Sequence, residues 1–439
     1  MTLADIIIIG AGPGGYELAA EAAAEGQNVI LIEKNQLGGT CLNRGCIPTK
    51  ALCKSAEVAL TVSEAETFGV SANCSSVNYA TASQRKDEVV CQLREGVAMA
   101  VGKCEVVEGE AVFGDAQTVI VGEEAYTAPK IVVATGSIPA VLPIPGAEYA
   151  IDSDRFLELQ ELPSNITIIG GGVIGIEFAS ILNAFGVTVN VIEFCKEILP
   201  PFDKDIAKRL RTILQKRGIN ICVSSSAKSI EKTESGLIVN YEAKGKPASI
   251  ETDMVIMAVG RRPLVPQGLE NAGVKITRRG IEVNEKMETS VTGIYAIGDV
   301  NGLCMLAHAA SAQGRIVLGK NINLEVIPAA VFTTPECSMV GKTEEQLKSE
   351  GINIKTAKTL FRGNGKALAM AEPEGLVKLI VDADSGKILG CHIIGPHAAD
   401  LIQEVALAMA SGLSVSTVAD TIHGHPTLGE VVQQAARML

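Results

Sequence analysis

The chain has 439 residues, of which 47% are hydrophobic and 20% are charged, a balance typical of globular proteins. This length is enough for about three domains, each with its own core. The formal net charge of −12 argues against nucleic acid and anionic membranes as partners. No apolar run reaches the roughly 18 residues that a membrane span needs, and the first strand begins so early that we expect no signal peptide.

Cysteines are scattered along the chain, and their number, 11, is odd. This distribution favours a reducing, cytoplasmic environment in which most thiols stay free. A disulfide that forms in such a compartment is more often catalytic than structural.

The first elements form a βαβ pattern. Residues 6–9 are a continuous apolar run, which predicts a buried strand of a parallel sheet. Residues 16–25 are rich in Ala and Glu and predict a helix. Residues 29–32 predict a second buried strand, which ends at Glu33.

The turn between this strand and helix has the form G-x-G-x-x-G, with Gly10, Gly12 and Gly15 as its glycines. They permit, in that order, the tight turn, the approach of a pyrophosphate to the backbone, and close packing of helix on strand. The helix N-terminus offers N–H donors to the phosphates, and Glu33 can accept a hydrogen bond from a ribose hydroxyl. The motif therefore predicts a dinucleotide site.

The same unit recurs later in the chain. A strand over residues 166–169, a glycine-rich turn over 170–175, a helix over 176–185 and a strand over 187–192 end at Glu193. The two acids lie at the same offset from the first glycine of their turns. We therefore expect two dinucleotide-binding domains in one chain.

Glu193 bears on the choice of nicotinamide cofactor. A carboxylate there favours a free ribose 2′-hydroxyl and repels a 2′-phosphate. The next residues are Phe194 and Cys195, so no arginine follows to bind that phosphate. NAD is therefore expected over NADP.

The rest of the chain divides by pattern. Residues 46–99 are mostly helical in pattern, and 104–133 predict short strands. Proline-rich stretches at 138–146 and 262–266 predict crossings between domains. From about residue 328 the pattern is α+β, with strands near 329–332 and 376–381, a helix at 399–410 and a last helix from about Thr427.

A later strand ends in Gly298 and Asp299, and Asp299 can hydrogen-bond the ribityl chain of a flavin. Because this pair follows the second Rossmann unit, the flavin domain must be completed by a returning segment. The runs 131–136 and 257–262 resemble crossings between domains near each cofactor.

Cys41 and Cys46 follow the first unit directly, with four residues between them. That spacing allows a disulfide across about one turn of a distorted helix, and Gly45 and Pro48 supply the distortion. Lys50 lies one turn beyond Cys46, where its ammonium favours the reactive thiolate. Two ordinary thiols or a metal pair are the alternatives, but no further ligands lie nearby in the sequence, and we expect no resident metal.

Thiol–disulfide exchange needs a proton acceptor, for which histidine is suited near neutral pH. His425 precedes Pro426 and is therefore expected to be extended. Glu430 lies within reach and can orient the imidazole. Thr427 to Glu430 also fits a capping box, in which Glu430 serves the backbone, and one carboxylate has enough oxygens for both roles.

Taken together, these motifs resemble those of the pyridine nucleotide–disulfide oxidoreductase family, most specifically in residues 38–50 and 423–430. The resemblance covers essentially the whole chain. It implies an α/β fold with two Rossmann-like dinucleotide-binding domains plus a C-terminal α+β dimerisation domain. The expected divisions are 1–141 for the first part of the FAD-binding domain, 142–263 for the NAD-binding domain, 264–327 for the second, central part of the FAD-binding domain, and 328–439 for the dimerisation domain.

The resemblance also implies catalytic roles. Cys41 would be the thiol that exchanges with substrate, and Cys46 the thiolate in contact with the flavin. Lys50 would lie near the flavin, paired with Glu177, which could otherwise be a partly exposed helix carboxylate. His425 would be the acid–base and Glu430 its partner, both from the other subunit of a homodimer, with His423 structural.

The cofactor residues follow in the same way. The residues expected at FAD are Gly10, Gly12, Gly14, Gly15, Glu33, Lys34, Gly39, Thr40, Lys50, Ala111, Thr135, Gly136, Asp299, Ala307 and His308. The residues expected at NAD are Gly170, Gly172, Val173, Ile174, Gly175, Glu193 and Gly260.

The activity implied is the oxidation of protein-bound dihydrolipoamide by NAD⁺ through the cysteine pair and FAD. The partner would be a lipoyl-bearing acyltransferase or carrier protein of a 2-oxo acid dehydrogenase or glycine cleavage type system. Alternatives are a related NAD(P)H-dependent reductase of another disulfide, or a mainly structural subunit of a large complex. Arg44 departs from the commonest family pattern, which has a small apolar residue between the cysteines, and could tune the thiols or the choice of substrate.

Overall fold

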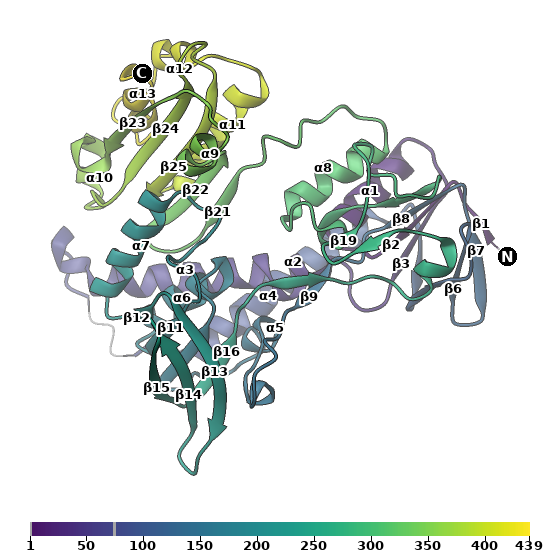
Figure 1. Cartoon of the computed structure of the whole chain (residues 1–439), viewed down its shortest axis with the longest axis horizontal. Coiled ribbons are helices and arrows are strands. Elements are labelled where there is room, and N and C mark those ends of the chain that lie inside the picture. The colour runs from purple at the N-terminus through teal and green to yellow at the C-terminus, as the bar shows by residue number, and fades with distance from the viewer. Residues whose placement is uncertain (1, 73–75) are drawn as a thin grey trace.

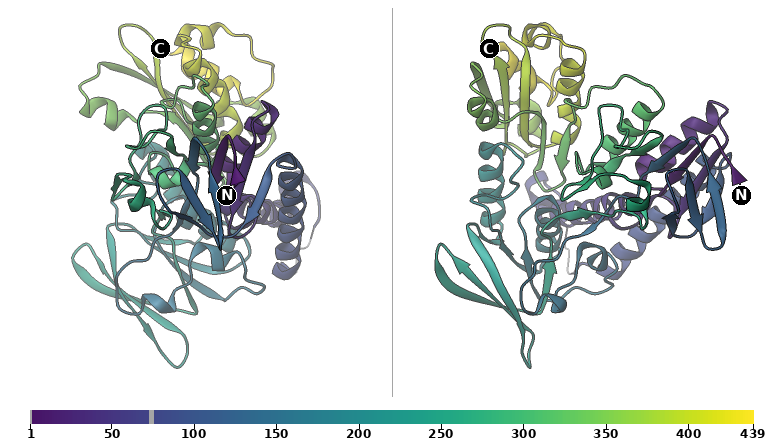
Figure 2. Two further views of the ribbon diagram at one scale, coloured as in Figure 1. Left: turned by 90° about the vertical axis from the view of Figure 1, so that its right-hand side faces the viewer. Right: turned by 45° about the vertical axis from the view of Figure 1, so that its right-hand side comes forward.

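The computed structural model describes residues 2–72 and 76–439, arranged as two units built on parallel sheets and one built on an antiparallel sheet (Figure 1). In Figure 1 the C-terminal antiparallel unit lies at the upper left, above α7, and the first unit lies at the right. Two further views show the sheet β13–β15 projecting away from the C-terminal unit (Figure 2). The expected fold class is confirmed. No helix in the described part of the chain combines the length and apolar character of a membrane span.

The first unit is a five-stranded parallel sheet of order β20-β8-β2-β3-β4. Its strands are β2 (Ile6–Ile9), β3 (Val29–Glu33), β4 (Glu105–Glu108), β8 (Lys130–Val133) and β20 (Ile294–Ala296). Strand β20 comes from beyond the second unit, so a returning segment completes this sheet. Helices α1 (Pro13–Ala24) and α8 (Ala307–Val317) lie side by side on it (Figure 1).

A smaller sheet of order β1-β7-β6-β5 borders the first unit. Its strands are β1 (Thr2–Leu3), β5 (Ala111–Phe113), β6 (Thr118–Val121) and β7 (Glu124–Thr127). Buried side chains from both sheets, Phe113 and Tyr126 among them, share one hydrophobic cluster with Ile7 and Ile30. The small sheet therefore covers one face of the large one.

The second unit repeats the pattern with a parallel sheet of order β12-β11-β10-β16. Its strands are β10 (Asn165–Ile169), β11 (Thr188–Ile192), β12 (Asn220–Cys222) and β16 (Met254–Met257), with helices α6 (Val173–Ala184) and α7 (Lys204–Lys216). An antiparallel sheet is added by β13 (Ser225–Lys232), β14 (Leu237–Ala243) and β15 (Lys246–Thr252).

Helices and short strands join the units. The helices are α2 (Gly39–Arg44), α3 (Cys46–Ser63), α4 (Tyr79–Ala100) and α5 (Ser153–Phe156), with 3-10 turns η1 (Ala65–Phe68), η2 (Ala147–Tyr149), η3 (Leu269–Ala272) and η4 (Gly298–Asn301). Strands β9 (Ser137–Pro139) and β17 (Arg261–Pro263) pair antiparallel where the chain crosses between the two Rossmann units, and β18 (Ile276–Thr277) pairs with β19 (Gly280–Ile281).

The C-terminal unit is an antiparallel sheet of order β21-β22-β25-β24-β23. Its strands are β21 (Ala329–Val331), β22 (Glu336–Gly341), β23 (Ile354–Leu360), β24 (Leu376–Asp382) and β25 (Ile388–Gly395). Its helices are α9 (Glu344–Ser349), α10 (Gly365–Ala369), α11 (Ala398–Ala410), α12 (Val415–Asp420) and α13 (Glu430–Arg437), with the 3-10 turn η5 (Phe361–Gly363).

Several helix boundaries differ from those expected. Helices α1 and α6 begin at Pro13 and Val173, three residues earlier than predicted, because the glycine turns lead straight into helix and proline is well tolerated in a first helical turn. The last helix begins at Glu430 and not near Thr427, because the Thr427 hydroxyl donates to the carbonyl of Gly424 and does not cap a helix. The helical stretch expected over 46–99 is two helices, α3 and α4, and residues 73–75 within it lie outside the described part.

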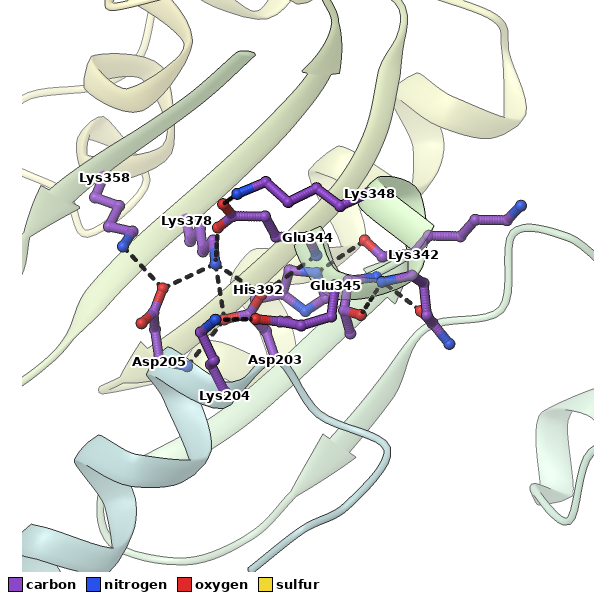
Figure 3. Close-up of polar contacts among 12 residues, drawn as sticks. Asp203, Lys204, Asp205, Lys342, Glu344, Glu345, Lys348, Lys358, Lys378 and His392 are labelled. Atoms are coloured by element: carbon purple, nitrogen blue, oxygen red, sulfur yellow. Dashed lines mark hydrogen bonds and ion pairs between the residues drawn. The ribbon is translucent and has the colours of Figure 1, made fainter. Parts of the chain in front are cut away.

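A buried cluster of charges joins the second unit to the C-terminal unit (Figure 3). Lys378 of β24 has no exposed surface, and its Nζ lies 2.7 Å from Asp203 Oδ2, 2.8 Å from Asp205 Oδ2 and 2.7 Å from Glu344 Oε2. Asp203 is also fully buried and caps α7 by accepting from the N–H of Asp205. A single cation thus ties the start of α7 to β24 and α9.

The surroundings keep the cluster ionised. Burial alone would raise the pKa of both Asp205 and Glu344, but lysine partners lower each to about 2. Asp205 accepts hydrogen bonds from Lys358 and Lys378. Glu344 accepts them from Lys348 and Lys378. Burial alone would lower the pKa of Lys378, but its carboxylate partners raise it. The stabilisation from the two carboxylates is therefore present at neutral pH and is lost as the pH falls from about 4 toward 2.

Replacing this lysine tests the junction. Lys378→Met leaves three carboxylates without their shared cation, so we expect the free energy of unfolding at neutral pH to fall by about 3–5 kcal/mol. Chemical denaturation followed by circular dichroism measures the change. Lys204→Met is the matched control, because this exposed lysine pairs with Glu345 at the rim of the same cluster and should cost less than about 1 kcal/mol. Equal losses for the two variants would contradict the assignment.

Candidate active site

Both glycine-rich turns open into one cavity of about 1460 Å³, which extends across the first and second units. Every residue expected at FAD lines it except His308, and every residue expected at NAD lines it except Gly175. His308 is exposed, and its Nε2 lies 2.7 Å from the carbonyl oxygen of Pro328. Gly175 is needed for packing, because a Cβ there would lie 2.0 Å from the carbonyl oxygen of Gly170.

The first turn is shaped to admit a ligand at its centre. A Cβ at Gly10 would lie 2.4 Å from the carbonyl oxygen of Ala134, and one at Gly15 would lie 1.9 Å from that of Gly10, so both positions require glycine. A Cβ at Gly12 would meet no atom closer than 4.0 Å, which leaves its backbone open to a diphosphate. The residues present therefore fit a bound dinucleotide.

Glu33 is held by the turn that it faces. Its Oε2 accepts the N–H of Ala11 at 2.7 Å, and its Oε1 accepts the N–H of Asn35 at 2.9 Å. Lys34, beside it, pairs with Glu110 at 2.9 Å. The backbone thus fixes the carboxylate at the end of β3, where a ribose would lie.

The second turn has the same construction. Gly170 would meet the carbonyl oxygen of Ala258 at 2.3 Å if it carried a Cβ, whereas a Cβ at Gly172 would meet nothing within 4 Å. Glu193 is buried, and its two oxygens accept the N–H groups of Gly171 at 2.5 Å and Cys195 at 2.6 Å. A carboxylate has capacity for further donors, so Glu193 can still accept from a ribose hydroxyl.

The cysteine pair lies between these two turns, at the junction of two helices. The expectation of one distorted helix is wrong: α2 ends at Arg44, Gly45 breaks the helix, and Cys46 is the first residue of α3. Gly45 fits there because a Cβ would already lie 3.0 Å from the carbonyl oxygen of Thr40. Cys41 and Cys46 are both free cysteines, and their side chains are close enough for one thiol to donate a hydrogen bond to the other.

The two thiols differ in acidity. The hydrogen bond from Cys41 lowers the pKa of Cys46 to about 7, and Lys50 lowers it further against the effect of burial. The same hydrogen bond, together with burial, raises the pKa of Cys41. Cys46 is therefore the sulfur that carries the negative charge near neutral pH.

Lys50 is held by a buried carboxylate. Its Nζ lies 3.0 Å from each oxygen of Glu177, a residue of α6 that is only 3% exposed. Glu177 Oε1 also accepts the N–H of Phe332 at 2.9 Å, and the Phe332 ring lies 4.5 Å from the ammonium. Burial alone would lower the pKa of Lys50, but Glu177 raises it, so the lysine stays charged beside Cys46.

His425 and Glu430 lie together in the C-terminal unit, before and at the start of α13. His425 Nδ1 is 2.9 Å from Glu430 Oε1, while Oε2 accepts the N–H of Thr427 at 2.9 Å, so the carboxylate contacts both imidazole and backbone. The His425 side chain is 79% exposed. Neither residue is among the described residues that line the cavity with Cys41. His423 differs, because its Nε2 contacts Glu404 at 2.9 Å and its side chain is 9% exposed.

Three residues at the site were not expected from the sequence. Phe332 supplies a ring and an N–H to the Lys50–Glu177 pair, and Ser137 and Arg261 form hydrogen bonds that lead to Asp299. A partial signal for Arg261 is its place directly after Gly260 in a predicted crossing. No sequence pattern marks Phe332, because its partners come from two other units.

Family models match nearly all of the chain. The model of the pyridine nucleotide-disulphide oxidoreductases matches residues 4–314, and the model of their dimerisation domain matches residues 327–436. The chain belongs to the pyridine nucleotide-disulphide oxidoreductase family.

Relatives and solved structures agree with this membership. A dihydrolipoyl dehydrogenase of Geobacillus stearothermophilus is 41% identical over 449 residues, covering 99% of this chain and 96% of the relative. A dihydrolipoyl dehydrogenase of Bacillus subtilis is 39% identical over 450 residues, with the same coverage. The HOCl-induced flavoprotein disulfide reductase RclA of Escherichia coli, solved as a Cu(II) complex, superposes with a TM-score of 0.88 at 31% identity and covers 100% of both chains.

Membership makes this protein a pyridine nucleotide-disulphide oxidoreductase, an enzyme that acts on a sulfur group, and it implies a flavin and a pyridine nucleotide as cofactors. The geometry agrees with this class, since one cavity joins two dinucleotide turns and a dithiol with the half-buried cation Lys50 beside it.

The hydrogen bond between the sulfurs makes a prediction for the acidity of Cys46. Cys41→Ala removes the donor and should raise the pKa of Cys46 by about 1 to 2, whereas Cys41→Ser keeps a hydroxyl donor and should leave it near 7. The pKa of Cys46 is measured by ultraviolet absorbance of the thiolate as a function of pH. The absorbance of the same variant carrying Cys46→Ala in addition is subtracted, so that the difference reports Cys46 alone. An equal pKa in the two variants would show that the hydrogen bond is not the cause.

Proposed function

We propose that this enzyme is a dihydrolipoyl dehydrogenase, which oxidises protein-bound dihydrolipoamide with NAD⁺. The observation that carries the proposal is the dithiol of Cys41 and Cys46 between two dinucleotide turns of one cavity. The dihydrolipoyl dehydrogenases among its relatives, similar over nearly their whole length, support lipoamide as the disulfide partner.

The first turn, with Glu33 and Asp299, would hold FAD, and the second turn, with Glu193, would hold NAD. Glu193 supports NAD over NADP because its buried carboxylate would repel a 2′-phosphate. The flavin and the nicotinamide supply the hydride and electron chemistry when bound, while the protein positions them.

The chain's own residues would carry the sulfur chemistry. A thiolate of dihydrolipoamide attacks Cys41 Sγ, which breaks the Cys41–Cys46 disulfide, forms a mixed disulfide and releases the Cys46 thiolate. The second lipoyl sulfur then attacks the lipoyl sulfur of the mixed disulfide, which closes the lipoyl ring and frees Cys41. Lys50 keeps Cys46 charged throughout, held in place by Glu177.

Protons would move through His425. Its Nδ1 donates to Glu430, which leaves Nε2 to take the proton of the first lipoyl thiol. Because His425 is exposed and lies outside the cavity lining of its own chain, we propose that it serves Cys41 of a second subunit. The dimerisation domain of this family supports such a homodimer. The partner substrate would be a lipoyl-bearing acyltransferase or carrier protein.

Turnover of dihydrolipoamide with NAD⁺ tests the proposal. Cys41→Ser and Cys46→Ser should each leave less than about 1% of this activity, because exchange needs both sulfurs. NADP⁺ should be used at least about tenfold less efficiently than NAD⁺. Formation of NADH under anaerobic conditions is the readout, with NADH-dependent reduction of a dye as the control that bypasses the cysteines.

Two outcomes would overturn the assignment. Faster turnover of glutathione disulfide with NADPH than of lipoamide with NADH would show another disulfide substrate. Undiminished lipoamide turnover in both cysteine variants would remove the relay and favour a mainly structural subunit.

The histidine is tested separately. His425→Ala should lower dihydrolipoamide oxidation by about 100-fold to 10,000-fold, the usual contribution of a general acid–base, with dye reduction unchanged. His397→Ala is the matched control, an exposed histidine of the same unit. Mixed dimers of Cys41→Ser and His425→Ala chains should regain activity, because one of their two sites then has both residues intact. If mixing restores nothing, each chain uses its own histidine.

A further inference from the structure

A chain of polar contacts runs through the place where the two Rossmann units cross. Arg261, at the start of β17, donates from Nε to Ser137 Oγ at 2.8 Å and from Nη2 to the Ser137 carbonyl oxygen at 2.9 Å. Ser137 Oγ donates in turn to Asp299 Oδ2 at 2.5 Å. All three residues line the cavity.

The direction of these hydrogen bonds is fixed by chemistry. An arginine side chain is always a donor, and a serine hydroxyl has one proton and can accept from others. Ser137 therefore accepts from Arg261 and donates its own proton to Asp299. This occupies one oxygen of Asp299 and leaves the carboxylate with capacity for a hydroxyl of a ligand.

The arginine also balances the charge of a buried acid. Burial raises the pKa of Asp299, while the Ser137 hydrogen bond and the Arg261 charge act against it. Burial, and to a smaller extent the charge of Asp299, raise the pKa of the nearby Cys304 thiol. Arg261 also forms an ion pair with Asp154 of α5, whose Oδ1 lies 3.5 Å from its Nη1.

Arg261 belongs to a segment that links the two units. It lies on the strand that leaves the second unit directly after Gly260, and it pairs with β9, which leaves the first unit. The acceptor at the proposed flavin site is thus oriented by a cation from the crossing strand of the nucleotide-binding unit.

We propose that Arg261 is a positioning residue for the flavin, which through Ser137 keeps Asp299 oriented and ionised as the acceptor for a flavin hydroxyl. This inference rests on the proposed assignment of FAD to the first unit. It adds a residue that acts through Ser137 and does not touch the reacting atoms.

Flavin binding by the full chain tests it, with no need for turnover. Apoprotein of the unmodified chain, Arg261→Gln, Ser137→Ala and Arg262→Gln is titrated with FAD, and the quenching of flavin fluorescence gives the dissociation constant. Arg262→Gln is the matched control, because it removes the same charge from the next residue of β17, whose side chain is exposed. We expect Arg261→Gln to bind FAD about 10-fold to 100-fold more weakly, as for loss of a hydrogen bond to a charged group, and Arg262→Gln to bind normally.

The pH dependence separates this role from general disruption of the fold. Without Arg261 the pKa of Asp299 rises further, so the loss of FAD affinity on acidification should begin at a higher pH in Arg261→Gln than in the unmodified chain or in Arg262→Gln. Arg261→Lys keeps the positive charge but lacks the planar guanidinium that donates two hydrogen bonds to Ser137. It should therefore restore the pH dependence of FAD binding more fully than the affinity for FAD at pH 8.

Three results would count against the inference, and they are distinguishable. Equal affinity and equal pH profiles in Arg261→Gln and Arg262→Gln, with tight binding by the unmodified chain, would overturn this inference alone. Failure of the unmodified chain to bind FAD would overturn the proposed function and this inference with it. If Arg261→Gln does not fold, Ser137→Ala replaces it. That variant removes the hydroxyl that links Arg261 to Asp299 and keeps the arginine. Normal binding of FAD by Ser137→Ala would overturn the inference.

Discussion

The ion pair between the half-buried Lys50 and the buried Glu177 is the contact on which the rest of this active site depends. Lys50 comes from α3, which follows the first Rossmann unit, and Glu177 comes from α6 of the second. The same carboxylate accepts the N–H of Phe332, at the end of β21 in the C-terminal unit. Because a buried charge is costly without partners, the three units must meet correctly for this carboxylate to be satisfied. The carboxylate of Glu177 in turn keeps Lys50 charged beside the thiolate of Cys46, its neighbour on α3.

The two dinucleotide turns show why a local sequence motif is enough to predict a binding site. In each, the first and third glycines are required by contacts with backbone oxygens, and the middle glycine is the one left open. In each, the acid at the end of the following strand is fixed by two backbone N–H groups. All of these partners are close in sequence or on adjacent parallel strands. A pattern of glycines and one acid is therefore enough to specify the site.

The distance between partners in the sequence decides which features could be predicted. The two Rossmann units, the cysteine pair and the carboxylate of Glu430 follow from local spacing, because their partners lie within one βαβ unit or one loop. The break at Gly45 was not predicted, because glycine next to a helix signals distortion as well as termination. Phe332 was out of reach for a different reason: it contributes a main-chain N–H, which no residue type reveals, to partners in other units.

Buried charges recur where the units join, and they make the units interdependent. Lys378 joins α7 to the C-terminal sheet, Glu177 joins α3 and α6 to Phe332, and Arg261 joins the crossing strands to Asp299. At each junction the charged group and at least one partner come from different segments, so neither segment alone can bury its charge without loss. Apolar packing continues across the same boundaries, since Leu52 of α3 and Ile394 of β25 share one core cluster. Hydrophobic burial is not directional, so it holds the units together without fixing their alignment. The hydrogen-bonded ions supply the missing direction, and at the cavity a small error in alignment would separate Lys50 from Glu177.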